Sequence, residues 1–258
     1  MNQISLALKT KLLNREPLFA GWTSLGHPQV MEMLVRAGMD FMAIDIEHST
    51  ISQEQSQRII AACHQEGVAC LPRIATHNQE AIKRVLDSGA DGLLVQMVNT
   101  QEEVETIIAD IKYPPVGRRT YGVNRAQSYG FDFDAYIESW NQGSSLILQI
   151  ESIQAVENIE KLLNFEEVDG VMIGPYDMSG SLGVPGQTSH PKVIEASRTV
   201  IDACKRYKKS CGTQVADATS EGVQSLFDLG YTFVVLGSDL FILWKWAEQM
   251  RGLMQSFR

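Results

Sequence analysis

The chain has 258 residues, of which 44% are hydrophobic and 21% are charged, a balance typical of ordinary globular proteins. Its formal net charge of −9 argues against nucleic acid as a partner, because phosphate binding requires a basic surface. Its apolar runs are too short to span a bilayer, and its first residues lack the pattern of a secretory signal. We therefore expect a cytoplasmic protein with neither a membrane nor a nucleic-acid partner.

Alternating segments predict the fold. The amino-terminal residues predict a short amphipathic helix, and helix-like windows at 28–38, 52–67, 78–89, 152–164 and 218–230 separate apolar, β-rich segments. Ser52 and Asn78 are candidate N-caps, and Gly89 is a candidate helix end. This alternation predicts one α/β domain over residues 1–258, a single (β/α)₈ TIM barrel with a parallel sheet. The eight predicted strands lie at 18–25, 41–47, 69–74, 92–97, 145–150, 170–175, 210–215 and 233–238.

Two segments depart from this alternation. Residues 113–142 form a connection longer than usual, and such connections often carry function. The tail at 240–257, LFILWKWAEQMRGLMQSF, predicts a final helix that is apolar around most of its circumference. That helix could cover its own barrel or be buried in a neighbouring subunit. The four cysteines, which lack metal-site spacing, are expected to be reduced core thiols.

Polar side chains follow most of the predicted strands, at the edge where a (β/α)₈ barrel carries its active site. Any one of them could instead be a helix cap or a loop carboxylate. Because polar residues occur at the ends of several strands and not of one alone, they indicate an active site. They are Asp45, Glu47 and His48, then Arg73, then Gln149 and Glu151, then Asp177, then Gln214 and Asp217, and finally Ser238 and Asp239.

The residue types suggest a mechanism. Glu151 and Asp177 are candidate ligands of Mg²⁺ or Mn²⁺, because carboxylates with open coordination positions suit these ions. Arg73 could stabilise a carboxylate or an enolate, and His48 is the candidate general base. No predicted strand contains a lysine, which disfavours a Schiff-base aldolase and favours a metal route. The remaining histidines are expected to be surface or capping residues: His27, His64, His77 and His190.

The same stretches resemble the HpcH/HpaI family of class II pyruvate aldolases, which includes 4-hydroxy-2-oxoheptanedioate and 2-keto-3-deoxy sugar-acid aldolases. They are AGMDFMAIDIEHS, KRVLDSGADGLLVQMVNT, YPPVGRR, LQIES and VDGVMIGPYDMSGSLG, in the family's order over nearly the whole chain. The resemblance implies a pyruvate-type TIM barrel that reversibly cleaves a 4-hydroxy-2-oxo acid to pyruvate and an aldehyde through a metal-bound pyruvate enolate. It also implies a homohexamer, a trimer of dimers, in which the last helix is exchanged between subunits.

The resemblance also implies roles for individual residues. Glu151 and Asp177 match the ligands of a divalent ion, expected to be Mg²⁺ or Mn²⁺, with Co²⁺ as a further candidate. Arg73 matches the residue that stabilises the enolate, and His48 matches the base. Asp87 matches an aspartate that raises the basicity of this histidine. Trp22, Gln149, Tyr176, Asp177 and Gln214 are expected to contact the substrate, and Asp45 and Glu47 to support the polar network.

Asp87 lies in a helix that should run away from its own active site. We therefore expect it to act on His48 of a neighbouring subunit or to stabilise an interface. The stretch TYGVNRAQSYG also departs from the family, because Tyr121 and Asn124 add bulk and polarity to a glycine-rich segment. Gln214 stands where long-chain dioate aldolases carry an apolar residue, which suggests a shorter or hydroxylated aldehyde or a buried structural hydrogen bond. Two alternatives stay open, an acyl-CoA lyase-like member of the superfamily and a non-catalytic sugar-acid-binding barrel.

Overall fold

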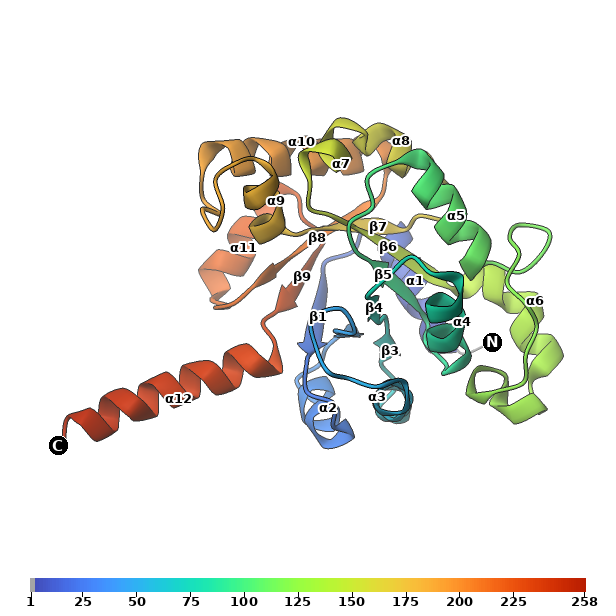
Figure 1. Ribbon diagram of the computed structural model, residues 1–258, viewed down its shortest axis with the longest axis horizontal. Helices are drawn as coiled ribbons and strands as arrows, with labels where there is room; N and C mark the ends of the chain where they lie inside the picture. The colour runs from blue at the N-terminus through green and yellow to red at the C-terminus, as the bar shows by residue number, and fades with distance from the viewer. Residues whose placement is uncertain (1–2) are drawn as a thin grey trace.

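The computed structural model describes residues 3–258, and in this range all strands pair in parallel within one curled sheet (Figure 1). The strand order is β3-β2-β1-β9-β8-β7-β6-β5-β4. A curled parallel sheet with helices between its strands defines a TIM-barrel-like α/β fold. The strands are β1 (Leu18–Thr23), β2 (Phe41–Ile44), β3 (Ala69–Cys70), β4 (Arg73–Ile74), β5 (Gly92–Val95), β6 (Ser145–Ile150), β7 (Gly170–Ile173), β8 (Ser210–Val215) and β9 (Phe233–Leu236).

All eight predicted strands are present, but the third is divided into β3 and β4 by two residues that include Pro72. Proline has no backbone N–H and therefore interrupts a ladder of hydrogen bonds. On one side of the break, β3 pairs with β2, and on the other side β4 pairs with β5. A single bridge joins Asp45 to Arg73, and the N–H of Ile46 donates to the Arg73 carbonyl at 3.0 Å. The two ends of the strand order thus meet in one six-residue segment, 69–74.

The helices that the sequence predicts begin close to the predicted residues, and two further long helices, at 101–111 and 191–207, lie outside the predicted windows. Ser52 caps α3 in a capping box with Gln55, Asn78 caps α4, and Gly89 adopts a φ of +102° just beyond α4. The predicted window at 152–164 forms two short helices, and the expected long connection 113–142 contains most of α6 as well as the 3₁₀ helix η1 (Arg125–Gly130). The α-helices are α1 (Gln3–Leu13), α2 (Pro28–Val35), α3 (Gln53–Gln65), α4 (Gln79–Asp87), α5 (Gln101–Ile111), α6 (Phe133–Gly143), α7 (Ile153–Glu157), α8 (Ile159–Leu163), α9 (Pro175–Ser181), α10 (Pro191–Tyr207), α11 (Ser220–Leu229) and α12 (Asp239–Gln255).

Both faces of the sheet are buried, which explains why the strand sequences are apolar throughout. One cluster lies inside the curl and includes Ala20, Phe41, Leu94 and Phe233, and Leu12 of α1 joins it. The other cluster joins the outer face of the sheet to the surrounding helices. The four cysteines are free and buried, as predicted. They are Cys63, Cys70, Cys204 and Cys211.

Helix α12 projects away from the rest of the molecule (Figure 1). Among its residues only Asp239 is buried. The Asp239 carboxylate anchors the helix to the end of β1, because it accepts hydrogen bonds from the Thr23 hydroxyl at 2.5 Å and the Leu25 N–H at 3.0 Å. Of the two expectations for the tail, covering its own barrel is therefore wrong. Its exposed apolar side chains are Leu240, Ile242, Leu243, Trp244, Trp246, Leu253 and Met254.

A search of the helices within residues 3–258 finds none with the length and apolar character needed to cross a bilayer.

Candidate active site

Arg73 is the centre of an ion-pair network at the carboxyl-terminal edge of the sheet. Its side chain is buried, with Nη2 at 2.9 Å from Asp45 Oδ1 and Nη1 at 3.0 Å from Glu47 Oε2. The guanidinium also packs on the Trp22 ring, 4.8 Å from its centroid, and the indole N–H lies 3.4 Å from Asp45 Oδ2. Two carboxylates and an aromatic face therefore fix the orientation of one cation.

His48 stands beside this network but is open to solvent. Its side chain is 68% exposed, and its Nε2 lies 3.7 Å from Glu47 Oε2. The turn that carries it is organised by Asp45, whose Oδ1 accepts a hydrogen bond from the His48 backbone N–H at 3.0 Å. Asp45 thus sets the position of both the arginine and the histidine, while the imidazole stays accessible to a ligand.

Glu151 is a buried carboxylate that has no cationic hydrogen-bond partner among residues 3–258. The Met97 backbone N–H donates to Oε1 at 2.8 Å, and Gln149 Nε2 donates to Oε2 at 2.7 Å. Burial raises the pKa of Glu151 to about 7; the Met97 hydrogen bond opposes this rise, and the charges of Asp177 and Glu47 add to it. Burial also raises the pKa of Glu47, against the opposing effects of Arg73 and His48. Negative charge is therefore crowded at this edge.

Two backbone features place the Glu151 carboxylate. Met97 adopts a φ of +49°, in the left-handed region that non-glycine residues rarely occupy, and its N–H points at the carboxylate. At Gly174, directly after β7, a Cβ atom would lie 2.7 Å from Glu151 Oε2, so the chain passes too close for any side chain. The buried oxygens Gln149 Oε1 and Glu47 Oε2 accept no hydrogen bond from residues 3–258, although the latter keeps its ion pair with Arg73.

The remaining predicted residues occupy the same edge with more exposure. Tyr176 and Asp177 lie in the first turn of α9, and both side chains are exposed. Gln214 is half-buried in β8, and its Nε2 donates to the Gly237 carbonyl at 3.4 Å, which is the structural hydrogen bond considered above. Asp217 forms an ion pair with Lys245 of α12 at 2.6 Å. Asp217 and Asp239 therefore hold α12, whereas Tyr176, Asp177 and Gln214 stay available at the edge.

Asp87 lies elsewhere, at the end of α4, which leads into the amino-terminal end of β5. Its Oδ1 accepts a hydrogen bond from Nη2 of buried Arg119 at 2.8 Å. The Arg119 guanidinium packs on three aromatic rings at centroid distances of 4.6 to 5.6 Å, those of Tyr113, Tyr136 and Trp140. Within one chain, Asp87 is thus held at the opposite end of the sheet from His48.

The donor set at the edge is suited to a hard divalent ion. Within the described residues, no group of three or more His, Cys, Asp or Glu side chains is arranged to hold a metal. Glu151 and Asp177 offer two carboxylates, and Gln149 Oε1 is a buried oxygen that lacks a donor. An oxygen-only set of this size fits Mg²⁺ or Mn²⁺, which complete their coordination with water and substrate oxygens.

Sequence reasoning missed the two backbone contributions. Gly174 stands in the sequence as the residue that ends an apolar strand, which is a weak signal for a close approach. Nothing in the sequence around Met97 indicates that its N–H faces the carboxylate that follows the neighbouring strand β6.

A curled parallel sheet with ionisable residues gathered at its carboxyl-terminal edge is the architecture of a TIM-barrel-like enzyme. Residues 19–245 match the HpcH/HpaI aldolase/citrate lyase model, and the chain belongs to this family. It is 33% identical over 233 residues, 90% of each chain, to 5-keto-4-deoxy-D-glucarate aldolase of Salmonella paratyphi C. It is also 33% identical over 238 residues, 91% of each chain, to hydroxypyruvate/pyruvate aldolase of Roseobacter denitrificans.

A crystal structure of an HpcH/HpaI aldolase/citrate lyase family protein from Burkholderia cenocepacia has the same fold. The TM-score is 0.90 at 27% identity, with 97% of this chain and 99% of that chain covered. Family membership and the aldolase relatives identify the chain as a carbon–carbon lyase.

Proposed function

We propose that the chain is a divalent-metal-dependent aldolase that reversibly cleaves a 4-hydroxy-2-oxo acid to pyruvate and an aldehyde. The observation that carries this proposal is the buried Glu151 carboxylate, whose pKa is raised to about 7 beside Asp177 and the Arg73 network. Buried carboxylates that crowd one another favour the binding of a cation. The names of the relatives, a keto-deoxy-glucarate aldolase and a hydroxypyruvate/pyruvate aldolase, support the reaction class.

Glu151 and Asp177 are the residues that would hold the ion, with Mg²⁺, Mn²⁺ or Co²⁺ as the candidates. When bound, such an ion acts as a Lewis acid toward the 2-oxo group of the substrate. Asp177 is exposed while Glu151 is buried, so the two carboxylates would present the ion at the mouth of the site rather than inside the sheet.

The chain's own residues supply the rest of the chemistry. His48 takes the proton from the 4-hydroxyl group, and Glu47 beside it stabilises the imidazolium that results. As the bond between C3 and C4 breaks, Arg73 donates to the oxygen that gains negative charge. Asp45 holds the Arg73 guanidinium and the His48 backbone in fixed positions during this step. The proton held by the His48 imidazolium then passes to C3, which completes pyruvate and restores the base, and the reverse sequence forms the bond.

Substrate contacts favour a polar aldehyde partner. Trp22 carries the Arg73 guanidinium on its ring, Gln149 has an oxygen without a donor, and Tyr176 is exposed at the edge. Gln214 uses its amide nitrogen in a long hydrogen bond of 3.4 Å, which leaves its side-chain oxygen for a ligand hydroxyl. We therefore favour a short or hydroxylated aldehyde derived from a sugar acid over an apolar one.

Assembly belongs to the same proposal. We propose a closed (β/α)₈ barrel formed as one domain of residues 1–258, active in the cytoplasm as a homohexamer that exchanges α12 between subunits. The apolar side chains that α12 leaves exposed support burial against a neighbour. The position of Asp87, away from its own His48, supports a role toward the histidine of an adjacent subunit or in the interface.

Pyruvate release from 5-keto-4-deoxy-D-glucarate, measured with the purified full chain and a coupled lactate dehydrogenase assay, tests the proposal. We expect turnover with Mg²⁺ or Mn²⁺, loss of turnover in EDTA, and recovery when the ion is restored. Glu151→Gln should remove the metal-dependent turnover, whereas Glu157→Gln, an exposed glutamate on α7, serves as the matched control. Full activity in EDTA would contradict the metal route. If a panel of 4-hydroxy-2-oxo acids releases no pyruvate, the aldolase proposal is wrong for this chain.

A further inference from the structure

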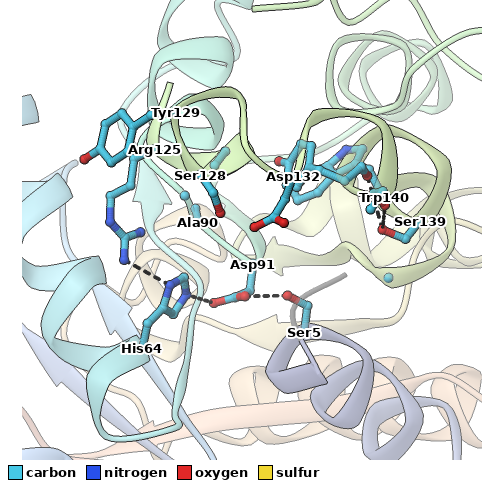
Figure 2. A pocket seen from close by; sticks show the side chains of 15 residues that line it. Ser5, His64, Ala90, Asp91, Arg125, Ser128, Tyr129, Asp132, Ser139 and Trp140 are labelled. Atoms are coloured by element: carbon cyan, nitrogen blue, oxygen red, sulfur yellow. Dashed lines mark hydrogen bonds and ion pairs between the residues drawn. The ribbon is translucent and has the colours of Figure 1, made fainter. Parts of the chain in front are cut away.

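A cavity of about 550 Å³ lies beside the residues that lead into β5, and Figure 2 shows the side chains that line it. It opens at the amino-terminal end of β5, and α1, α3, η1 and α6 contribute to its walls. None of the residues assigned above to metal, substrate or proton transfer lines it. Its volume is within the range of small-molecule sites in proteins.

One wall presents the positive charge of Arg125, which has no acidic partner within residues 3–258. Arg125 donates through Nη1 to the Ser88 carbonyl and through Nη2 to His64 Nδ1, both at 3.2 Å. Because Nδ1 accepts, the hydrogen of the neutral His64 ring lies on Nε2, 2.8 Å from Asp91 Oδ2. Arg125 itself forms no ion pair with any residue between 3 and 258. The expectation that His64 is a surface or capping residue is therefore wrong, since its ring supports the arginine.

The opposite wall presents the negative charge of Asp132, which also has no ion-pair partner among the described residues. Asp132 occupies the N-cap position of α6, where an aspartate normally accepts a hydrogen bond from the first helical turn. Its side chain makes no such bond and faces the cavity instead (Figure 2). It forms no ion pair with the described part of the chain. A carboxylate and a guanidinium thus line one space without neutralising each other.

The backbone around the cavity is shaped to form these walls. Ser128, Tyr129 and Gly130 adopt consecutive left-handed conformations, with φ of 49°, 55° and 104°. Non-glycine residues avoid this region, and runs of it cluster where proteins hold ligands. At Gly89, whose φ of +102° favours glycine, a Cβ atom would lie 2.3 Å from Arg125 Nη1, so a side chain there would displace the guanidinium from this position. The chain therefore maintains the cavity by specific conformations rather than by loose packing.

We infer that this cavity binds a small zwitterion of the α-amino-acid class. A simple anion would meet Arg125 but also the Asp132 carboxylate, and a simple cation would be repelled by Arg125. A zwitterion can direct its carboxylate to Arg125 and its ammonium group to Asp132. The rings of Tyr129, Tyr136 and Trp140 supply apolar surface for a side chain.

Calorimetric titration of the full-chain protein tests the inference without any dependence on turnover. L-phenylalanine and L-serine serve as a large and a small probe, in EDTA so that carboxylates are not drawn to a metal at the active-site edge. For the phenyl series, 3-phenylpropanoate lacks the ammonium group and 2-phenylethylamine lacks the carboxylate. We expect at least one amino acid to bind once per chain, and for the phenyl series each truncated analogue to bind at least about tenfold more weakly.

Two variants locate the binding. Asp132→Asn should weaken amino-acid binding by about tenfold or more and leave 3-phenylpropanoate unaffected, because only the ammonium contact is removed. Asp134→Asn, which changes an exposed carboxylate two residues along the same helix that does not line the cavity, should bind like the unmodified chain. The inference is overturned if neither amino acid binds at about 10 mM, or if Asp132→Asn leaves their binding unchanged.

Discussion

At the carboxyl-terminal edge of the sheet, the hydrogen bonds that the buried Glu151 carboxylate accepts from the described part of the chain come from a backbone N–H and an amide. At the amino-terminal edge, the buried Asp169 carboxylate receives Lys9 Nζ at 2.7 and 3.0 Å and the Leu146 N–H at 2.9 Å. Lys112 lies beside this pair and donates to Ser144 Oγ at 2.7 Å. Both edges bury charge, but within residues 3–258 the Asp169 carboxylate is matched with a cation and the Glu151 carboxylate is not.

This difference in charge pairing suggests that Asp169 contributes to stability and that Glu151 contributes to function. A matched buried pair is costly to break, because removal of one partner leaves the other charge buried and uncompensated. An unmatched carboxylate lowers the stability of the chain by itself, and this cost is offset only when a proton or a cation binds. The comparison therefore predicts that equivalent substitutions at the two edges have opposite consequences.

The largest effect is expected from Glu151→Gln. Loss of the carboxylate should lower metal-dependent pyruvate release by about 10⁴-fold, equivalent to about 5.5 kcal/mol, because the proposed ion loses its buried ligand. The free energy of unfolding of the metal-free protein should stay the same or rise, since a carboxylate with a raised pKa has been removed. Kinetic assays and urea unfolding measure the two effects. A strongly destabilised variant would show that Glu151 is structural.

The opposite outcome is expected for Asp169→Asn. Lys9 would be left as a buried charge without its partner, and the free energy of unfolding should fall by about 3 to 5 kcal/mol. Turnover per folded molecule should not change, because this edge carries none of the proposed chemistry. Urea unfolding and activity corrected for the folded fraction provide the measurements, and undiminished stability would contradict the comparison.

Lys112 gives the amino-terminal edge a dependence on pH. Burial lowers its pKa to about 8, and the nearby charge of Lys9 adds to this effect. Between pH 8 and about 10.5, the unfolded chain keeps a proton that the folded chain has lost, so this group's contribution to the free energy of unfolding rises with pH. The rise over the whole window is about 3 kcal/mol.

The difference in free energy of unfolding between the unmodified chain and Lys112→Met, measured at both ends of this window, isolates the effect from other titrating groups. A difference that is constant with pH would show that the lysine keeps its proton in the folded state.

The smallest effect is expected from Asp45→Asn. The amide keeps the size of the side chain but weakens its hold on Arg73 and on the His48 backbone, so both should shift slightly. Small misplacements of catalytic groups lower turnover by about 10- to 100-fold. Glu54→Gln, at an exposed ion pair with Arg58, is the control and should leave turnover unchanged. Unaltered kinetics in Asp45→Asn would mean that Glu47 alone positions Arg73.

Much of the fold could be predicted because its determinants are local. Parallel strands that are buried on both faces can be recognised as apolar runs in the sequence. Ser52 and Asn78 are residue types that favour helix N-caps, and each of them precedes a helix. The helix α6 was hidden by the polar, glycine-containing segment before it, and its Trp140 becomes a core residue only through contact with distant parts of the chain.

The site was predictable in its residue types but not in its connections. Arg73 and Glu151 both come at the ends of predicted parallel strands, so the sequence alone predicts that they lie at the same edge of the sheet. The ion pair between Asp45 and Arg73 depends on the register of strands that meet across the break at Pro72, which no local pattern encodes. The Met97 N–H that holds Glu151 depends in the same way on a backbone conformation set by the surrounding fold.

The break between β3 and β4 has a consequence for how the chain acquires activity. Arg73 sits where the first and last members of the strand order meet, and it is tied to both through its backbone and its guanidinium. The arginine can reach its working position only after these two parts of the chain have come together. With the role proposed for Arg73, a partly folded chain whose seam is still open cannot turn over substrate, and turnover reports on the completion of folding.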